Sequence, residues 1–272
     1  MALVEQLTRR KAVIGMIHVG ALPGTPRSRA PLDASVAQSV AEAGLYTNAG
    51  LDGLLIENMH DVPYLCGQVG PEIVAGMTAV GLAVRRESPL PLGVQILAAA
   101  NREALAAAQA CGAAFVRVEN FAYAHVADEG LMPTAEAGPL LRYRRQIGAE
   151  SVAILADVKK KHSSHAITAD VSLARAAQTI AFFGADGIVV TGAATGAPTA
   201  VEDLVAVRSA VNLPVCVGSG LTPDNLAALW PHADIFIVGS FFKVDGRWSN
   251  AVDPGRVGTF MEVVRRLRAA GG

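Results

Sequence analysis

The chain has 272 residues, of which 51% are hydrophobic and 17% charged, and its 23 basic and 24 acidic residues leave a net charge of −1. This composition excludes intrinsic disorder, which needs low hydrophobicity and high net charge, and it lacks the basic excess typical of nucleic-acid binders. The length suits one large domain or two small ones, and α/β barrels commonly fill this size with a single domain.

Eight short, apolar, β-branched segments predict buried parallel strands, because strands covered on both faces are almost continuously hydrophobic. In chain order they are Ala12–Val19, Gly53–Asn58, Leu92–Leu97, Phe115–Asn120, Ala153–Val158, Gly187–Thr191, Pro214–Gly218 and Ile235–Gly239. Longer alanine-rich, amphipathic segments predict the helices between and after them, at Asp33–Ala49, Pro71–Arg86, Arg102–Ala110, Pro139–Ile147, Ala169–Phe183, Ala200–Ala210, Pro223–Trp230 and Arg256–Ala269. The strict alternation predicts a single (β/α)8 barrel over residues 1–272. An open doubly wound sheet is the alternative, and eight repeats without a break in composition favour closure.

Residues typical of helix ends support these boundaries. The expected N-caps are Asp33, Asn101, Thr168, Thr199 and Thr222, the last followed by Pro223 at the first helical position. The expected C-terminal glycines are Gly50, Gly112, Gly148 and Gly184. The four longest irregular stretches, Gly20–Leu32, Met59–Gly70, Phe121–Gly138 and Lys159–Ile167, all follow strands. In a barrel this puts every long loop on the C-terminal face, where active sites are built.

Polar side chains gather where the predicted strands end. By the two-residue alternation of a strand, Arg117 and Glu119 share one face of the fourth strand, and Asp157 and Lys159 share one face of the fifth. Charged residues are costly to bury unless they are paired, so a cluster at the catalytic face indicates acid–base chemistry or enolate stabilisation. The alternative is a paired structural network that fills the barrel mouth. The catalytic candidates are His18, Glu57, Arg117, Glu119, Asp157 and Lys159.

Three roles are open for Lys159: a Schiff-base nucleophile, a cation that holds an anion, or the first residue of a solvated basic run. A Schiff-base lysine needs a lowered pKa. Because Asp157 lies two residues earlier, we expect Lys159 to be charged, which disfavours the Schiff base.

Two glycine–serine turns follow the last two predicted strands. Barrels that bind phosphate use these two loops together with the N-terminus of a short extra helix, which Phe241–Lys243 is expected to form. Glycines allow backbone N–H groups to approach an anion, and serines add hydroxyl donors. The alternative is that they only make tight turns. The phosphate-binding candidates are Gly192, Gly218, Ser219, Gly220, Gly239 and Ser240.

The sequence gives little indication of a metal site or of a disulfide bond. His162 and His165 lie in one predicted loop near Asp157, and Glu119, His125 and Asp128 are further possible ligands, but no recognised metal motif is present. We therefore expect no resident metal or other cofactor, with a divalent metal as the less favoured alternative. Cys66, Cys111 and Cys216 lie far apart in apolar surroundings and are expected to be buried free thiols.

No segment is expected to span a membrane. No uncharged run exceeds fifteen residues, the length of Gly187–Val201, which is interrupted by glycines and a proline, and a spanning helix needs about 18 apolar residues. The N-terminal residues also lack an apolar core of signal-peptide length. We expect a cytoplasmic protein, with peripheral membrane association as an alternative. Its expected partners are a small phosphorylated ligand and further copies of itself, and no nucleic acid.

Several motifs resemble those of the BtpA/SgcQ family, in order and over nearly the whole chain. They are Gly15–Pro26, Asp52–Asn58, Phe115–Asn120, Asp157–His162, Val217–Asn225 and Ile237–Lys243. The resemblance implies a (β/α)8 fold related to ribulose-phosphate-binding barrels, and it provides no catalytic residues to carry over. Cyanobacterial members are associated with photosystem I biogenesis, and other members resemble proteins of sugar metabolism.

Two functions therefore follow from the sequence. The first is an enzyme of lyase or isomerase type that acts on a small phosphorylated sugar or nucleotide-like ligand. The second is a non-catalytic assembly or stability factor for photosystem I. The polar strand ends favour the enzyme, because a pure scaffold has no need of charges in the barrel mouth.

Overall fold

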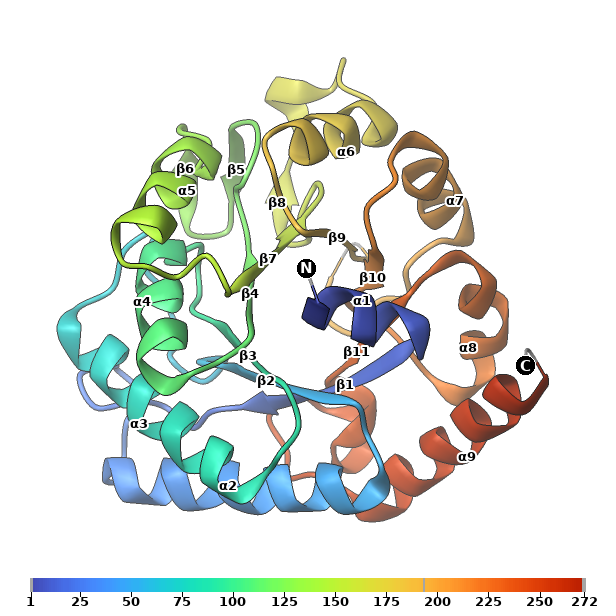
Figure 1. The fold of residues 1–272 in the computed structure, drawn as a ribbon. Coiled ribbons are helices and arrows are strands. Elements are labelled where there is room, and N and C mark those ends of the chain that lie inside the picture. Colours follow the sequence, from blue (N-terminus) through green and yellow to red (C-terminus); the bar gives the residue numbers. More distant parts are fainter. Residues whose placement is uncertain (1, 193, 271–272) are drawn as a thin grey trace.

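Eight parallel strands close into a barrel in the computed structural model, which describes residues 2–192 and 194–270. The strands are β1 (Ala12–His18), β2 (Gly53–Glu57), β3 (Leu92–Gln95), β4 (Phe115–Val118), β7 (Ala153–Asp157), β9 (Gly187–Val190), β10 (Val215–Val217) and β11 (Ile235–Val238). Strand β1 pairs with both β2 and β11 and so closes the ring (Figure 1). The predicted (β/α)8 barrel is confirmed.

Eight helices surround this ring and match the predicted helices to within a few residues. They are α2 (Leu32–Ala49), α3 (Pro71–Glu87), α4 (Asn101–Cys111), α5 (Ala137–Gln146), α6 (Leu173–Phe182), α7 (Val201–Ala210), α8 (Pro223–Leu229) and α9 (Pro254–Ala270). The largest error is at α6, which begins four residues later than predicted because the Ser172 hydroxyl accepts the N–H of Arg175 and caps the helix there.

The helix ends were predicted better at the C-terminus than at the N-terminus. Gly50, Gly112, Gly148 and Gly184 all adopt the expected positive φ. Of the predicted N-caps, Thr222 is confirmed, since it forms a capping box with Asn225. The predictions for Asp33, Asn101, Thr168 and Thr199 are wrong. Two of these side chains have tertiary partners instead: the Asn101 amide donates to the Glu119 carbonyl and the Thr199 hydroxyl donates to the Ser219 carbonyl.

The barrel has an inner core and an outer core, because successive residues of each strand point to opposite sides. Outward-facing residues such as Val13, Leu54 and Val116 pack against the helices. Inward-facing residues such as Ile14, Leu55 and Phe115 fill the barrel itself. Gly93 leaves room for this filling, since a Cβ there would lie 2.1 Å from the Phe115 ring.

A short helix that was not predicted, α1 (Ala2–Arg9), covers the N-terminal end of the barrel. Its Val4 and Leu7 are buried in the same cluster as the inward-facing Ala12 and Ile235. Figure 1 shows α1 lying across the middle of the strand ring. Nearby, the Lys11 ammonium donates to the carbonyls of Trp230 and Ala233, which fixes the chain between α1 and β1.

A small antiparallel sheet lies in two loops that were predicted to be irregular. Strands β5 (His125–Ala127) and β6 (Gly130–Met132) form a hairpin in the loop after β4, and β8 (Ser163–Ser164), in the loop after β7, pairs with β5. The prediction for Phe121–Gly138 and Lys159–Ile167 is therefore wrong in part. Strands of two or three residues are too short to produce a readable alternation of apolar and polar residues.

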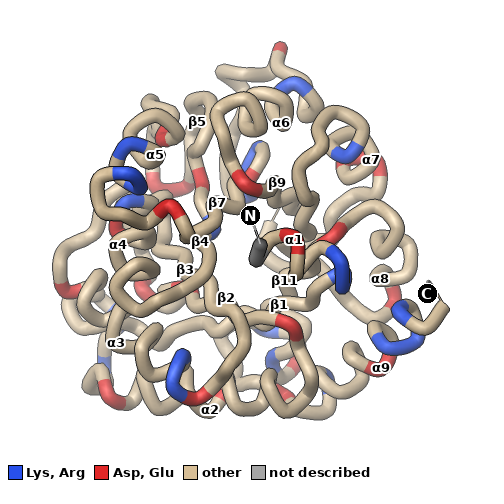
Figure 2. Tube along the Cα trace, viewed as in Figure 1, with Lys and Arg blue, Asp and Glu red and all other residues tan. Residues whose placement is uncertain are grey.

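Charged residues lie mainly on the helices and loops around the ring, as Figure 2 shows. None of the helices in residues 2–192 and 194–270 combines the length and the apolar character required to cross a membrane. The prediction of buried free cysteines holds for Cys111 and Cys216 and is wrong for Cys66, which is exposed in the loop after β2.

Candidate active site

A ring of polar residues and glycines forms the last inward-facing layer at the C-terminal end of the barrel. Below it, the inward-facing residues are apolar, among them Met16, Leu55 and Ile237. The alternation of each strand then brings a polar residue or a glycine to the next inward position. These residues are His18, Glu57, Gln95, Arg117, Asp157, Thr191, Gly218 and Gly239. Six of the twelve predicted site residues thus lie in this one layer at the barrel mouth.

The mouth contains two adjoining compartments. The larger has a volume of about 230 Å³ and reaches under the β5–β6 hairpin, whose Asp128 and Glu129 line it. The smaller, of about 40 Å³, lies against the glycine–serine turns after β10 and β11. The two share five lining residues, Glu57, Met59, Arg117, Lys161 and Thr195. One ligand can therefore occupy both.

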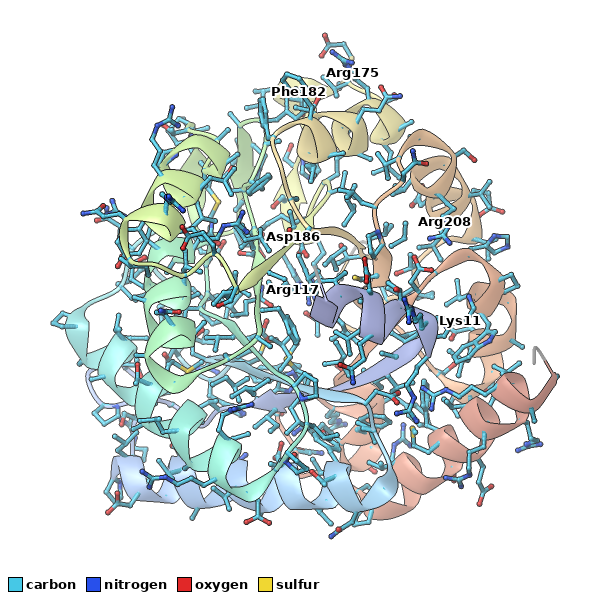
Figure 3. The ribbon with its side chains drawn as sticks, viewed as in Figure 1. Lys11, Arg117, Arg175, Phe182, Asp186 and Arg208 are labelled. Atoms are coloured by element: carbon cyan, nitrogen blue, oxygen red, sulfur yellow. The ribbon has the colours of Figure 1, made fainter. Side chains whose placement is uncertain are left out.

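Arg117 and Asp157 form a buried ion pair across the neighbouring strands β4 and β7. Both hydrogen bonds are 2.9 Å long, Nε to Oδ1 and Nη2 to Oδ2, which is the bidentate geometry that suits guanidinium and carboxylate. Burial opposes the charge of the guanidinium, but the carboxylates of Asp157, Glu57 and Glu119 together outweigh it, so the pKa of Arg117 is raised. Figure 3 shows Arg117 near the centre of the barrel. It is a fixed cation beneath both compartments.

Gly218 makes room for this cation. A Cβ at position 218 would lie 2.5 Å from a methyl of Val189 and 3.1 Å from Nη2 of Arg117. The glycine after β10 is therefore required by the guanidinium as well as by any ligand that approaches the turn.

His18 is a neutral base with its free nitrogen close to Glu57. Its Nδ1 lies 2.9 Å from the carbonyl oxygen of Trp248, and because a carbonyl only accepts, Nδ1 carries the hydrogen. Nε2 is then unprotonated, and it lies 3.9 Å from Oε2 of Glu57. Burial, assisted by the charge of Lys243, lowers the pKa of His18 to about 3.

The pKa of Glu57 is shifted in the opposite direction from that of His18. Burial raises the pKa of its carboxyl group, and the charges of Arg117 and Lys161 counteract this only in part. The buried mouth thus favours a neutral histidine beside a carboxyl group that holds its proton more tightly than usual. Pairs of groups whose pKa values are shifted apart are typical of acid–base sites.

The lysine that faces both compartments is Lys161, which sequence reasoning missed. Lys159 adopts φ +44°, so the alternation of β7 does not continue through it, and its ammonium donates to the Val171 carbonyl. It lines a small separate cavity that also contains His165. Lys161 lines both compartments of the mouth, and burial, followed by the charge of Arg117, lowers its pKa. No local sequence signal announces the backbone change at Lys159.

Glu119 lies at the far side of the larger compartment and is bound from two sides. Its Oε2 accepts the N–H of Ala99 at 3.0 Å and lies 3.1 Å from the Lys160 ammonium. Lys160 also lies 3.9 Å from Glu129 of the hairpin. This chain of charges connects the end of β4 to the hairpin.

Five of the six predicted phosphate-binding residues line the smaller compartment: Gly218, Ser219, Gly220, Gly239 and Ser240. Gly192 lies outside it, and its N–H donates to the Ser219 hydroxyl at 2.8 Å. That hydroxyl in turn donates to the Ala197 carbonyl, so it is already satisfied. Within residues 2–192 and 194–270, the N–H groups of Gly220 and Ser240 have no protein acceptor, so they remain available to a ligand. The short helix predicted at Phe241–Lys243 is a 3-10 turn at Ser240–Phe242.

Possible metal ligands do not gather. In the described part of the chain, no three His, Cys, Asp or Glu residues are placed so as to hold a metal ion. His162 instead accepts the Thr195 N–H at Nε2, and its Nδ1 lies 3.5 Å from Asp128. The rings of His125 and His165 lie 5.5 Å apart in the loops behind the mouth.

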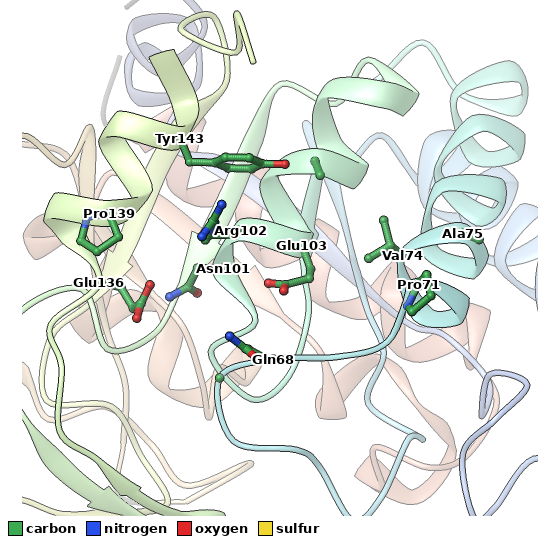
Figure 4. A pocket seen from close by; sticks show the side chains of 12 residues that line it. Gln68, Pro71, Val74, Ala75, Asn101, Arg102, Glu103, Glu136, Pro139 and Tyr143 are labelled. Atoms are coloured by element: carbon green, nitrogen blue, oxygen red, sulfur yellow. The ribbon is translucent and has the colours of Figure 1, made fainter. Parts of the chain in front are cut away.

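A larger cavity, of about 600 Å³, lies outside the barrel between the starts of α3, α4 and α5 (Figure 4). The Arg102 guanidinium stacks over the Tyr143 ring there, 4.6 Å from its centre. None of the predicted catalytic or phosphate-binding residues lines it. The smaller barrel mouth, with its buried charges, is the better candidate for chemistry.

Solved structures share the barrel at low sequence identity. The (S)-3-O-geranylgeranylglyceryl phosphate synthase of Thermoplasma acidophilum matches with a TM-score of 0.60 and 14% identity, over 98% of this chain and 99% of that one. The thiamine phosphate pyrophosphorylase of Pyrococcus furiosus matches with a TM-score of 0.58 and 15% identity, over 96% and 98%. A 3-hexulose-6-phosphate synthase matches with a TM-score of 0.57 and 16% identity, over 93% and 99%. At such identities the likeness supports the fold alone.

Sequence relatives are much closer. An uncharacterised mitochondrial protein of Caenorhabditis elegans is 47% identical over 264 residues, 95% of each chain. The photosystem I biogenesis protein BtpA of Synechocystis is 36% identical, over 97% of this chain and 91% of its own. An uncharacterised protein of Pyrococcus horikoshii is 33% identical, over 95% and 97%. The model of the BtpA family matches residues 9–266. The chain belongs to the BtpA family.

Proposed function

We propose that the protein is an enzyme of lyase or isomerase type that acts on a small phosphorylated sugar or nucleotide-like ligand by acid–base chemistry. One observation carries this proposal: an unprotonated His18 nitrogen lies 3.9 Å from a carboxyl group of raised pKa, in a buried mouth beside a compartment lined by glycine–serine turns. A base and an acid held together in a site that excludes water are suited to moving a proton between carbon and oxygen.

In the proposed reaction the phosphate lies in the smaller compartment and the carbon skeleton lies in the larger one. The free N–H groups of Gly220 and Ser240 donate to the phosphate oxygens, and Lys161 contributes a positive charge at the boundary between the compartments. Donors of this kind hold an anion without requiring a basic surface. A near-neutral chain is therefore compatible with an anionic ligand.

The proposed chemical step is a proton transfer next to a carbonyl group. Nε2 of His18 takes the proton from the carbon beside the carbonyl, while Glu57, in its protonated form, gives its proton to the carbonyl oxygen, which leaves an enediol. The carboxylate that this leaves on Glu57, 3.9 Å from Nε2, stabilises the imidazolium that the resting site disfavours. Arg117 and Lys161 stabilise the charge that develops on the oxygen. Asp157 holds Arg117 in place, and Lys161 takes the role that the strand pattern predicted for Lys159.

The scaffold function is the weaker alternative. It rests on the name of the Synechocystis relative, whereas the names of the relatives in Caenorhabditis elegans and Pyrococcus horikoshii mention no photosystem. Buried, opposed protonation states at a barrel mouth also have no use in a scaffold. The shared fold with enzymes named for phosphorylated compounds is in keeping with the proposal, although fold alone does not fix a reaction.

Hydrogen exchange with solvent tests the proposal without knowledge of the product. Sugar phosphates that carry a carbonyl are incubated with the protein in D₂O, and deuterium incorporation next to the carbonyl is followed by NMR. We expect at least one to exchange, and we expect His18→Gln and Glu57→Gln each to lower the rate by about 100-fold or more. Exchange at the wild-type rate in both variants would contradict the assigned roles. If the wild-type protein neither catalysed deuterium exchange into any sugar phosphate nor bound any phosphorylated probe, the proposed function itself would be contradicted.

A further inference from the structure

The two compartments of the mouth differ sharply in charge. The smaller one presents backbone N–H groups, and Lys161 lies at its boundary with the larger one. The larger one ends, on the side of the hairpin, at Glu119 and Glu129 with Lys160 between them, at 3.1 Å and 3.9 Å from its ammonium. One cation between two carboxylates leaves this end net negative. The same ligand therefore meets groups that attract an anion at one end and groups that repel one at the other.

The acidic end also has acceptor oxygens without donors. Gln95 is only 2% exposed, and its Oε1 has no hydrogen-bond partner in the described part of the chain. The same holds for Oε2 of Glu129, whose side chain is 10% exposed. Buried acceptors without a donor are unfavourable and uncommon. Both residues line the larger compartment, so a ligand there is the available source of donors.

The larger compartment also has an apolar part of its lining that includes aromatic rings. This part consists of Met59, Tyr64, Leu97 and Trp248. The Tyr64 hydroxyl donates to the Met59 carbonyl, which leaves its ring as a contact surface. A lining that combines apolar contacts with acceptor side chains suits a molecule that carries both C–H and hydroxyl groups.

We propose that the larger compartment binds the uncharged, hydroxyl-bearing end of a monophosphorylated ligand, with Gln95 and Glu129 as the hydrogen-bond acceptors and Glu129 as the group that excludes a second phosphate. This inference rests on the proposed function, because it takes the smaller compartment to hold the one phosphate. Glu129 lies in the turn of the β5–β6 hairpin, so this hairpin determines specificity.

Isothermal titration calorimetry with three probes tests the inference. The probes are inorganic phosphate, ribose 5-phosphate and ribulose 1,5-bisphosphate. We expect the wild type to bind ribose 5-phosphate at least about tenfold more tightly than inorganic phosphate, and more tightly than the bisphosphate. Gln95→Leu and Glu129→Leu each remove a hydrogen-bond acceptor, so we expect each to lower the affinity for ribose 5-phosphate by about tenfold. The affinity for inorganic phosphate should not change.

Glu129→Gln separates charge from hydrogen bonding, since it keeps an acceptor oxygen and removes the negative charge. We expect it to gain about tenfold in affinity for the bisphosphate and to retain ribose 5-phosphate within about threefold. Glu136→Gln, in the open cavity outside the barrel, is the matched control and should change nothing. Thermal unfolding checks that each variant is folded. If Gln95→Leu does not fold, the two Glu129 variants still test the inference.

The outcomes separate the two proposals. The inference would be overturned if both leucine variants bound ribose 5-phosphate as tightly as the wild type, or if the wild type preferred the bisphosphate. Neither result would count against the phosphate site. Failure of the wild type to bind inorganic phosphate and ribose 5-phosphate alike would count against the phosphate site, and the inference would fall with it.

Discussion

Replacing His18 should change how the stability of the protein depends on pH. The imidazole is buried at the mouth, its Nδ1–H donates to the Trp248 carbonyl, and its pKa is lowered to about 3. His18→Gln keeps an amide N–H for that carbonyl and removes the titrating group. It therefore isolates the cost of keeping the ring neutral.

The sign follows from proton binding in the two states. In the unfolded chain the ring takes up a proton below its ordinary pKa of 6.5, whereas in the folded protein it resists protonation down to about pH 3. The unfolded state is thus favoured increasingly as the pH falls through this window. Between about pH 8 and about pH 5 the loss of stability is about 2 kcal/mol, growing to roughly 4 kcal/mol near pH 3.

Urea unfolding followed by circular dichroism measures this difference. The free energy of unfolding of the wild type should fall more steeply between about pH 8 and about pH 5 than that of His18→Gln, by about 2 kcal/mol. Other buried histidines, such as His125, contribute equally to both proteins and cancel. His232→Gln, at the opposite end of the barrel, controls for replacing a histidine in general. Parallel pH profiles for His18→Gln and the wild type would refute the assignment of a buried neutral ring.

Three further substitutions test the mouth and the core. Lys161→Ala should slow deuterium exchange into a sugar phosphate by about 100-fold. Lys159→Ala, its near neighbour, should not, and equal rates in the two variants would contradict the placement of Lys161. Arg117→Met should destabilise the protein by about 3–5 kcal/mol, because it leaves a buried carboxylate without its cation; a loss below 1 kcal/mol in urea unfolding would argue against that pair. Gly93→Ala should cost about 1–3 kcal/mol, since its Cβ would lie 2.1 Å from the Phe115 ring, and an unchanged midpoint would contradict this packing.

The barrel itself was predictable because its signal is repeated. Each strand is a continuous apolar run, and each helix that follows ends at a glycine or a change of periodicity, so an error at one boundary does not affect the next. The mouth was predictable for the same reason. Once strands such as β2 and β4 are in place, alternation alone brings Glu57 and Arg117 to the inner face at the C-terminal end.

What escaped prediction depends on short segments and on single backbone angles. The hairpin strands have three residues each, too few to show a period. The Lys159 side chain does not lie on the expected face because its φ is positive. Lysine rarely adopts this conformation, so its presence in the sequence does not predict it. Two of the four failed N-caps have a different cause, since Asn101 and Thr199 use their side chains in tertiary contacts that only the closed barrel creates.

Helix α1, which covers the N-terminal end of the barrel, limits how a ligand can enter and leave the mouth at the C-terminal end. Val4 and Leu7 of α1 pack against the inward-facing apolar residues, so the polar mouth communicates with solvent at the face where the hairpin lies. In the proposed reaction, substrate and product must then use the same entrance in turn. A product that keeps its phosphate would compete with the next substrate molecule for the smaller compartment, so inhibition by accumulated product is expected.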